Sequence, residues 1–151
     1  MGVNIVSQDG EKELFVGPYS GFGKFRTTIA TALGCPSYEK YLEAIIEGMM
    51  PLMTETLDGI KKKLEAKRNI ERYAPLRQSE LQQLYVTKPY ARSFLEHSDC
   101  DGNWTVEQCK EVRHVLTDVV DLLEDWQKEA AIEFIEGLDY CIEHNQEVIF
   151  T

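Results

Sequence analysis

The stretch "HSDCDGNWTVEQC", residues 97–109, gathers side chains that could bind a metal ion. His97, Asp99, Cys100 and Asp101 lie close together in it and offer imidazole, thiolate and carboxylate ligands. Zinc prefers nitrogen and sulfur ligands, and the spacing of His97 and Cys100 suits half of such a site. Calcium prefers carboxylates at fixed positions of a loop that has glycine at its sixth position. These four residues are therefore a candidate metal site.

The other positions of the stretch do not supply the remaining ligands that a calcium or zinc site needs. With Gly102 at the sixth position, His97 and Gln108 occupy the first and twelfth positions, where calcium needs carboxylates. For zinc, Cys109 and His114 are further candidates, but five residues on one helix separate them by about 140°, so they cannot converge. The imidazole and the thiol of the stretch could also act as base and nucleophile, although no orienting group accompanies them.

A structural interpretation explains more of the same residues. Thr105 to Gln108 reads T-V-E-Q, a capping box with Thr105 as N-cap and Gln108 at N3. Trp104 and Cys109 then occupy the two positions of a hydrophobic staple. The aspartate and glycine before them indicate a turn. The stretch is predicted to be a rigid joint between helices, with metal binding as the alternative.

Apolar residues at helical spacing predict the elements that hold this joint. The strongest pattern covers 106–126, where Cys109, Val112, Leu116, Val119, Leu123 and Trp126 repeat every three or four residues. Gly34 is expected to end an early helix, and Ser37 to cap the next one. Pro51 is expected to stop or kink that helix. The predicted helices span about 24–34, 38–50, 53–64, 80–85, 87–97, 106–126 and 129–144.

Three short β-branched or aromatic stretches predict a small sheet. "VNIVS" and "ELFVG" flank Asp9-Gly10, a turn signal, and indicate an N-terminal hairpin followed by a loop, "GPYSGFG". "EVIF" at 147–150 is expected to be a terminal strand, which needs a partner to cover its edge. We therefore expect one α+β domain over 1–151, mostly helical, with an antiparallel sheet that joins the hairpin to the C-terminal strand.

The net charge of −10 is unevenly distributed along the chain. Residues 1–75 carry ten basic and ten acidic side chains, whereas 96–147 carry fifteen acidic and only three basic ones. Such a chain lacks the basic footprint of a nucleic-acid binder and attracts basic proteins instead. The candidate binding surface consists of four carboxylates near the end of the predicted helix 106–126: Asp118, Asp121, Glu124 and Asp125.

Other features point to an ordinary protein of the cytoplasm. The basic run at 61–68 has acidic neighbours and is expected to be a solvated helix face. No apolar run approaches the ~20 residues of a bilayer span, and the first residues do not resemble a signal peptide. We expect a cytoplasmic location, no membrane contact and no cofactor.

"FLEHSDCDGNWTVEQC" together with "FIEGLDYCIEHNQEVIF" resembles a family of short bacterial and phage proteins without an assigned function. The shared pattern is H-S-D-C-D-G, a cysteine seven residues after the glycine, an apolar-rich helix and a final strand. "YSGFGKFR" is similar to the N-terminal segment of that family. The resemblance covers about half of the chain, excludes 36–75, and implies one compact fold but no activity.

These observations favour a non-enzymatic interaction protein, such as a phage- or host-encoded inhibitor or adaptor. Its expected partner is another protein, either a basic one or one that itself binds nucleic acid. A metal-binding protein that uses the 97–108 loop is the alternative, and an enzyme of unassigned reaction is the third hypothesis.

Overall fold

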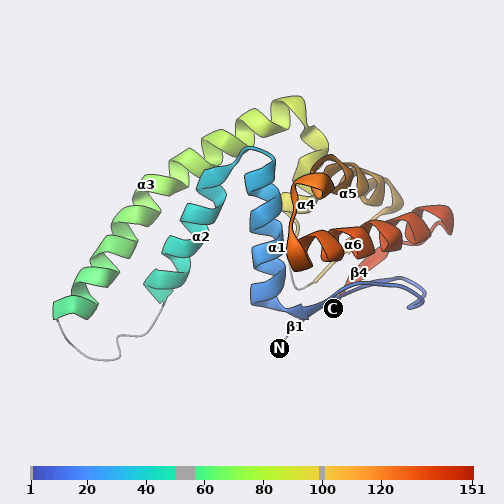
Figure 1. The fold of residues 1–151 in the computed structure, drawn as a ribbon, viewed down its shortest axis with the longest axis horizontal. Helices are drawn as coiled ribbons and strands as arrows, with labels where there is room; N and C mark the ends of the chain where they lie inside the picture. The colour runs from blue at the N-terminus through green and yellow to red at the C-terminus, as the bar shows by residue number, and fades with distance from the viewer. Residues whose placement is uncertain (1, 50–56, 99–100) are drawn as a thin grey trace.

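The computed structural model describes residues 2–49, 57–98 and 101–151 and shows a mostly helical α+β fold (Figure 1). The predicted fold class is confirmed. The elements in chain order are β1 (Gly2–Ser7), β2 (Glu13–Pro18), α1 (Tyr19–Ala32), α2 (Pro36–Met49), α3 (Leu57–Thr87), the 3-10 turn η1 (Pro89–Ala91), α4 (Arg92–Leu95), β3 (Asn103–Trp104), α5 (Val106–Val119), the 3-10 turn η2 (Val120–Leu122), α6 (Asp125–Glu143) and β4 (Val148–Phe150).

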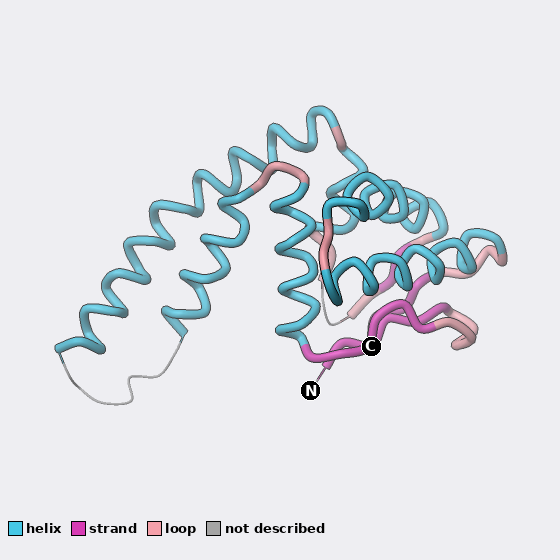
Figure 2. The backbone as a smooth tube through the Cα atoms, in the orientation of Figure 1, coloured by secondary structure: helices cyan, strands magenta, loops and turns pink. Residues whose placement is uncertain are grey.

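The sheet is antiparallel with the strand order β2-β1-β4-β3, and it lies along one side of the helices (Figure 2). The predicted hairpin and its pairing with the C-terminal strand are confirmed. Val3, Ile5 and Ser7 of β1 are buried, whereas the alternate residues Gly2 and Asn4 are exposed and Val6 is half-buried. This alternation is typical of a sheet that packs on a core with one face and meets solvent with the other.

The predicted turn at Asp9-Gly10 also ties the hairpin to α6. Gly10 has a φ of +77°, which glycine adopts without strain. The Asp9 carboxylate accepts hydrogen bonds from Ser7 Oγ at 2.6 Å and from Tyr140 Oη of α6 at 2.7 Å. These bonds, with Ser7 as the larger contributor, lower the pKa of Asp9 below its usual value. The turn is therefore fixed both locally and by a contact 131 residues away.

Helix α1 begins earlier than the sequence suggested. The segment "GPYSGFG" was expected to be a loop, but α1 starts at Tyr19 directly after Pro18, so two glycines lie inside its first turns. Phe22 and Phe25 of these turns are fully buried. Burial of two aromatic rings outweighs the ~1 kcal/mol that each glycine costs in a helix.

The predicted end of α1 at Gly34 is confirmed. Gly34 has a φ of +97°, and its N–H donates to Thr31 O, while Cys35 N donates to Ala30 O. This pair of bonds is a Schellman motif, which needs a residue in the left-handed region at this position. Ser37 is not the N-cap of α2, because the helix already begins at Pro36. Proline is favoured at the first helical position because it lacks an N–H.

Helix α3 is one continuous helix where the sequence suggested two. A separate short helix was expected over 80–85, but these residues lie inside α3, which also contains Pro75. Its last turns are held by the body of the protein, where Leu81, Leu84 and Tyr85 are buried. Tertiary packing therefore continues the helix through the break that the sequence suggested before residue 80.

The core is formed by packed aromatic rings. Phe22, Phe25, Phe94, Trp104 and Phe134 are all fully buried. Their ring centroids lie about 6 Å apart, for example 6.1 Å between Phe25 and Phe94 and 5.9 Å between Trp104 and Phe134. Such edge-to-face and offset pairs stabilise a core beyond their buried area.

Helix α2 and the first half of α3 form a hairpin that extends away from the body, and we call residues 36–49 and 57–72 the arm (Figure 1). Small side chains let the two helices approach: Ala44 and Ala66 are buried between them, and a Cβ on Gly48 would lie 3.8 Å from that of Ala66. The predicted stop at Pro51 lies outside the described residues. No helix in the described ranges is both long and apolar enough to cross a membrane.

Candidate functional site

Two regions carry the residues that the sequence singled out: the turn between α5 and α6, and the loop that precedes α5. The single helix expected over 106–126 is wrong, because α5 ends at Val119 and continues only as the 3-10 turn η2. Leu123 then adopts an extended backbone with φ −88° and ψ 156° and is buried. Helix α6 starts at Asp125 and packs back on α5.

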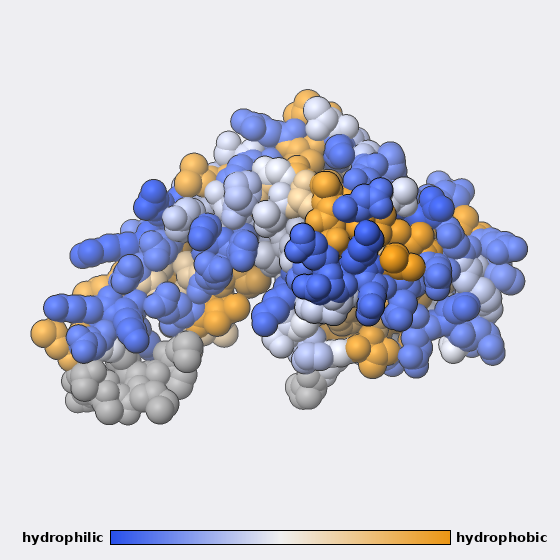
Figure 3. All heavy atoms as spheres, in the orientation of Figure 1, coloured by the Kyte–Doolittle hydropathy of each residue, from blue (hydrophilic) through white to orange (hydrophobic). Residues whose placement is uncertain are grey.

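The bend at 120–124 exposes two large apolar side chains among carboxylates. Leu122 is 66% exposed and Trp126 is 45% exposed, although the helical pattern had placed Trp126 on the buried face. Asp121, Glu124 and Asp125 around them are exposed as well. We call these five residues the acidic corner. Figure 3 shows apolar surface among hydrophilic side chains where α5 turns into α6.

The three carboxylates of the acidic corner are available to a partner. Within the described ranges, none of Asp121, Glu124 and Asp125 forms a side-chain hydrogen bond or an ion pair. Like charges this close together repel one another and raise the local negative potential. A basic group from outside would relieve that repulsion.

Asp118, the fourth candidate carboxylate, has internal partners instead. It accepts hydrogen bonds from Tyr90 Oη at 2.7 Å and from Lys88 Nζ at 3.3 Å, and His114 Nδ1 lies 3.7 Å away. Burial acts to raise the pKa of Asp118, but the bonds from Tyr90 and Lys88 outweigh it, and the pKa is lowered. Burial and the bond to Asp118 together raise the pKa of Tyr90 to about 12. Asp118 therefore joins η1 to α5.

The loop before α5 is held by its histidine. His97 Nδ1 lies 2.6 Å from Ser98 O, and Nε2 lies 3.0 Å from Asn103 O. The ring also packs on Phe150 of β4 with centroids 4.3 Å apart. Both ring nitrogens therefore lie against backbone carbonyl oxygens of the loop itself, and the tautomer decides which of them donates a hydrogen bond.

The structural interpretation of the loop is confirmed at the start of α5. Thr105 Oγ1 accepts from Gln108 N at 3.2 Å, and Gln108 Oε1 accepts from Thr105 N at 2.9 Å. Trp104 and Cys109 are both fully buried, as expected of a staple. A feature absent from the sequence reasoning is β3, in which residues 103–104 pair with β4. Two residues are too short a stretch to show a strand pattern.

Of the four candidate metal ligands, the structure describes only His97 and Asp101. Asp99 and Cys100 lie outside the described residues, and Asp101 is exposed beside Gly102, whose φ is +91°. Cys109 is buried, whereas the side chain of His114 is 57% exposed on another face of α5, so the two diverge as expected. Among the described residues no group of three His, Cys, Asp or Glu side chains could hold a metal ion.

Removal of metal ions tests the loop directly. We expect that dialysis against EDTA or a zinc chelator leaves the melting temperature unchanged, because His97 and the capping box hold the loop without a metal. An ion bound to the native state would stabilise it, and its loss would lower the melting temperature. Differential scanning fluorimetry with elemental analysis checks this. A drop of several degrees, together with one equivalent of metal in the untreated protein, contradicts the prediction.

Comparison with known proteins gives no further guide: no family model, curated protein or solved structure matches the chain.

Proposed function

We propose that this protein is a non-enzymatic binding protein, an inhibitor or adaptor encoded by a phage or its host, that recognises a basic surface of another protein through the acidic corner. The observation that carries the proposal is the exposure of Leu122 and Trp126 between three carboxylates that have no side-chain partner within the described ranges. Tryptophan is enriched among the residues that dominate protein interfaces. Exposed apolar side chains with a polar rim are typical of such interfaces.

The charges determine the class of partner. Carboxylates that surround an apolar centre attract Lys- and Arg-rich surfaces, raise the rate of association at low salt and repel acidic proteins and nucleic acids. Proteins that bind nucleic acid carry such basic surfaces and belong to the expected partners. Direct binding of nucleic acid by this protein is not expected.

We place this activity in the cytoplasm. The three described cysteines, Cys35, Cys109 and Cys141, are buried and free. Reduced cysteines are usual in a reducing compartment. Burial, the largest contribution in each case, raises the pKa of Cys109 to about 12 and that of Cys141 to about 11, so these thiols stay protonated and unreactive.

Charge reversal at the acidic corner tests the proposal. The variant Asp121→Lys/Glu124→Lys/Asp125→Lys should bind the partner at least about tenfold more weakly at low salt, because attraction becomes repulsion around the apolar centre of the interface. The partner is defined by affinity capture from the native cells with quantitative mass spectrometry, and its affinity is then measured by calorimetry with the purified protein.

The matched control changes the net charge by the same amount, but at positions of α6 outside the acidic corner. Glu133→Lys/Glu136→Lys/Glu143→Lys alters three exposed residues outside the corner and should lose much less affinity. Trp126→Ala should weaken binding with no change in its salt dependence, since it removes only apolar contact. Equal losses in the corner and control variants would show that the acidic corner is solvated surface.

A further inference from the structure

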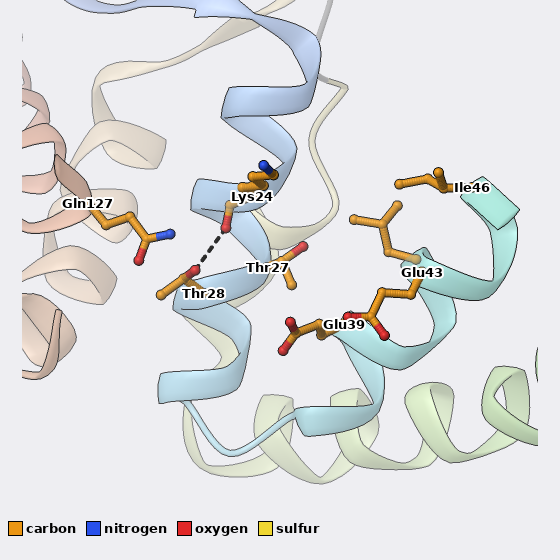
Figure 4. A pocket seen from close by; sticks show the side chains of 8 residues that line it. Lys24, Thr27, Thr28, Glu39, Glu43, Ile46 and Gln127 are labelled. Carbon is orange, nitrogen blue, oxygen red and sulfur yellow. Dashed lines mark hydrogen bonds between the residues drawn. The ribbon is translucent and has the colours of Figure 1, made fainter. Parts of the chain in front are cut away.

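A groove lies between α1 and α2. It consists of two adjoining hollows, of about 300 and 260 Å³, which share Thr28 and Glu39 as lining residues. Leu42 and Ile46 of α2 form its apolar wall, and Leu122 lies at its far end. Figure 4 shows Lys24 and the threonines on α1, opposite the glutamates of α2.

A buried hydroxyl group lies at the floor of this groove. The side chain of Thr27 lines the groove, the residue is only 6% exposed, and among the described residues its hydroxyl has no hydrogen-bond partner. In Figure 4 the hydroxyl of Thr27 points from α1 toward the space in front of α2. A buried hydroxyl without a hydrogen bond is costly, so the arrangement favours a ligand that brings a polar group to this point.

The rim of the groove is acidic on the α2 side. Glu39 and Glu43 line it, and both are exposed. Within the described ranges neither carboxylate forms an ion pair. The groove therefore has an apolar wall and an acidic rim. Such a surface fits a basic amphipathic helix, which would place its apolar face in the groove and its basic side chains on the rim.

The arm carries such a helix on its outer side. Leu57, Ile60 and Leu64 are 67%, 44% and 50% exposed. At 100° per residue they lie within an arc of about 60° on the side of α3 opposite to Ala66, which faces α2. We call these three residues the arm stripe. Three exposed apolar residues at this spacing, on the side of α3 that faces away from α2, are typical of an interaction face.

Basic side chains accompany the arm stripe. Lys61 and Arg68 project from nearly the same side of the helix, by the same helical geometry. Residues 57–72 contain six basic and three acidic side chains, a net +3 in a chain whose net charge is −10. This segment therefore carries positive charge that is complementary to Glu39 and Glu43 at the rim of the groove.

We propose that the groove receives the arm stripe of a second copy of this chain. The apolar residues of the stripe would cover Leu42 and Ile46, and its lysines would approach Glu39, Glu43 and the hydroxyl of Thr27. The stripe and the groove are different surfaces on opposite sides of the arm, so the contact is head-to-tail. Such contacts form rings or open chains, and the assembly grows with protein concentration.

Sedimentation equilibrium of the full chain tests this proposal without any foreign partner. At low salt and between about 1 and 200 µM, we expect the average mass to rise above the monomer mass of 17.3 kDa and to fall again at high salt. The arm variant Lys61→Glu/Lys67→Glu/Arg68→Glu and the groove variant Glu39→Lys/Glu43→Lys should each remain monomeric. An equimolar mixture of the two should associate again, because each mismatched charge then meets its opposite.

The apolar part of the contact has its own matched pair of variants. Ile60→Ser/Leu64→Ser should weaken association at least about tenfold. Leu76→Ser/Val86→Ser changes two exposed apolar residues farther along the same helix and should leave association intact. Circular dichroism confirms that each variant is folded. A wild-type protein that stays monomeric at all concentrations, or a mixture that does not associate, overturns the proposal; the acidic corner is unchanged in these variants, so the proposed function is tested separately.

Discussion

Trp104→Ala is expected to destabilise the protein by about 3–5 kcal/mol, the usual range for deletion of a buried aromatic ring. The ring is completely buried, and its centroid lies 4.8 Å from that of Phe150 and 5.9 Å from that of Phe134. Its Nε1 also donates to Ser93 O at 3.0 Å, a carbonyl that would lose this partner. For a chain of this length the melting temperature should fall by about 6–20 °C.

Two other substitutions make this prediction specific. Trp126→Ala removes the same side chain from an exposed position, 45% accessible, and should change the free energy of unfolding by less than about 1 kcal/mol. Thr105→Ala removes only the N-cap and should cost about 0.5–2 kcal/mol. Urea unfolding followed by circular dichroism measures all three. If the two tryptophan variants were equally stable, Trp104 would not be the centre of the core.

Gly137→Ala should destabilise the protein by about 1–2 kcal/mol, although the same change usually stabilises a helix by up to about 1 kcal/mol. Gly137 lies in α6 where the helix crosses β2, and it is buried. A Cβ at this position would lie 2.5 Å from Leu14 Cγ and 2.9 Å from Leu14 Cδ1. Because Cγ is held close to the backbone of β2, the strand or the helix must move to admit a methyl group.

Gly48→Ala is the matched control for this prediction. It also lies inside a helix, but its added Cβ would meet Ile70 Cδ1 at 3.6 Å and Ala66 Cβ at 3.8 Å, ordinary contact distances. This variant should be stabilised by about 0.5–1 kcal/mol. In a Leu14→Ala background, Gly137→Ala should lose its cost because the space is then free. A Gly137→Ala protein as stable as the Gly48→Ala one would refute the close approach of α6 and β2.

Several local features could be predicted from the sequence because their cause lies within a few residues. The capping box of Thr105 and Gln108, the turn at Gly10 and the helix end at Gly34 each depend on one side chain or one φ angle that neighbouring backbone groups require. The hairpin and its pairing with the last strand followed from alternation and from the need of a terminal strand for a partner.

Other features depended on contacts that local patterns do not contain. Two glycines lie inside α1 because Phe22 and Phe25 enter the aromatic core, and α3 passes through Ser79 because its last turns are buried in the body. The apolar spacing of 106–126 is compatible with one long helix and also with two shorter ones. The chain bends at 120–124, where Leu123 remains buried while α6 packs against α5.

The candidate sites divide in the same way. The sequence determined the acidic character of 96–147 and the cap at Thr105, since composition and short-range spacing are sufficient for both. Only the tertiary structure decided that Asp118 is bound by Tyr90 and Lys88, that Trp126 is exposed, and that a groove with the buried Thr27 hydroxyl at its floor lies between α1 and α2. Whether a side chain is exposed or paired depends on which distant segments approach it, and the spacing of residues along one segment does not contain that information.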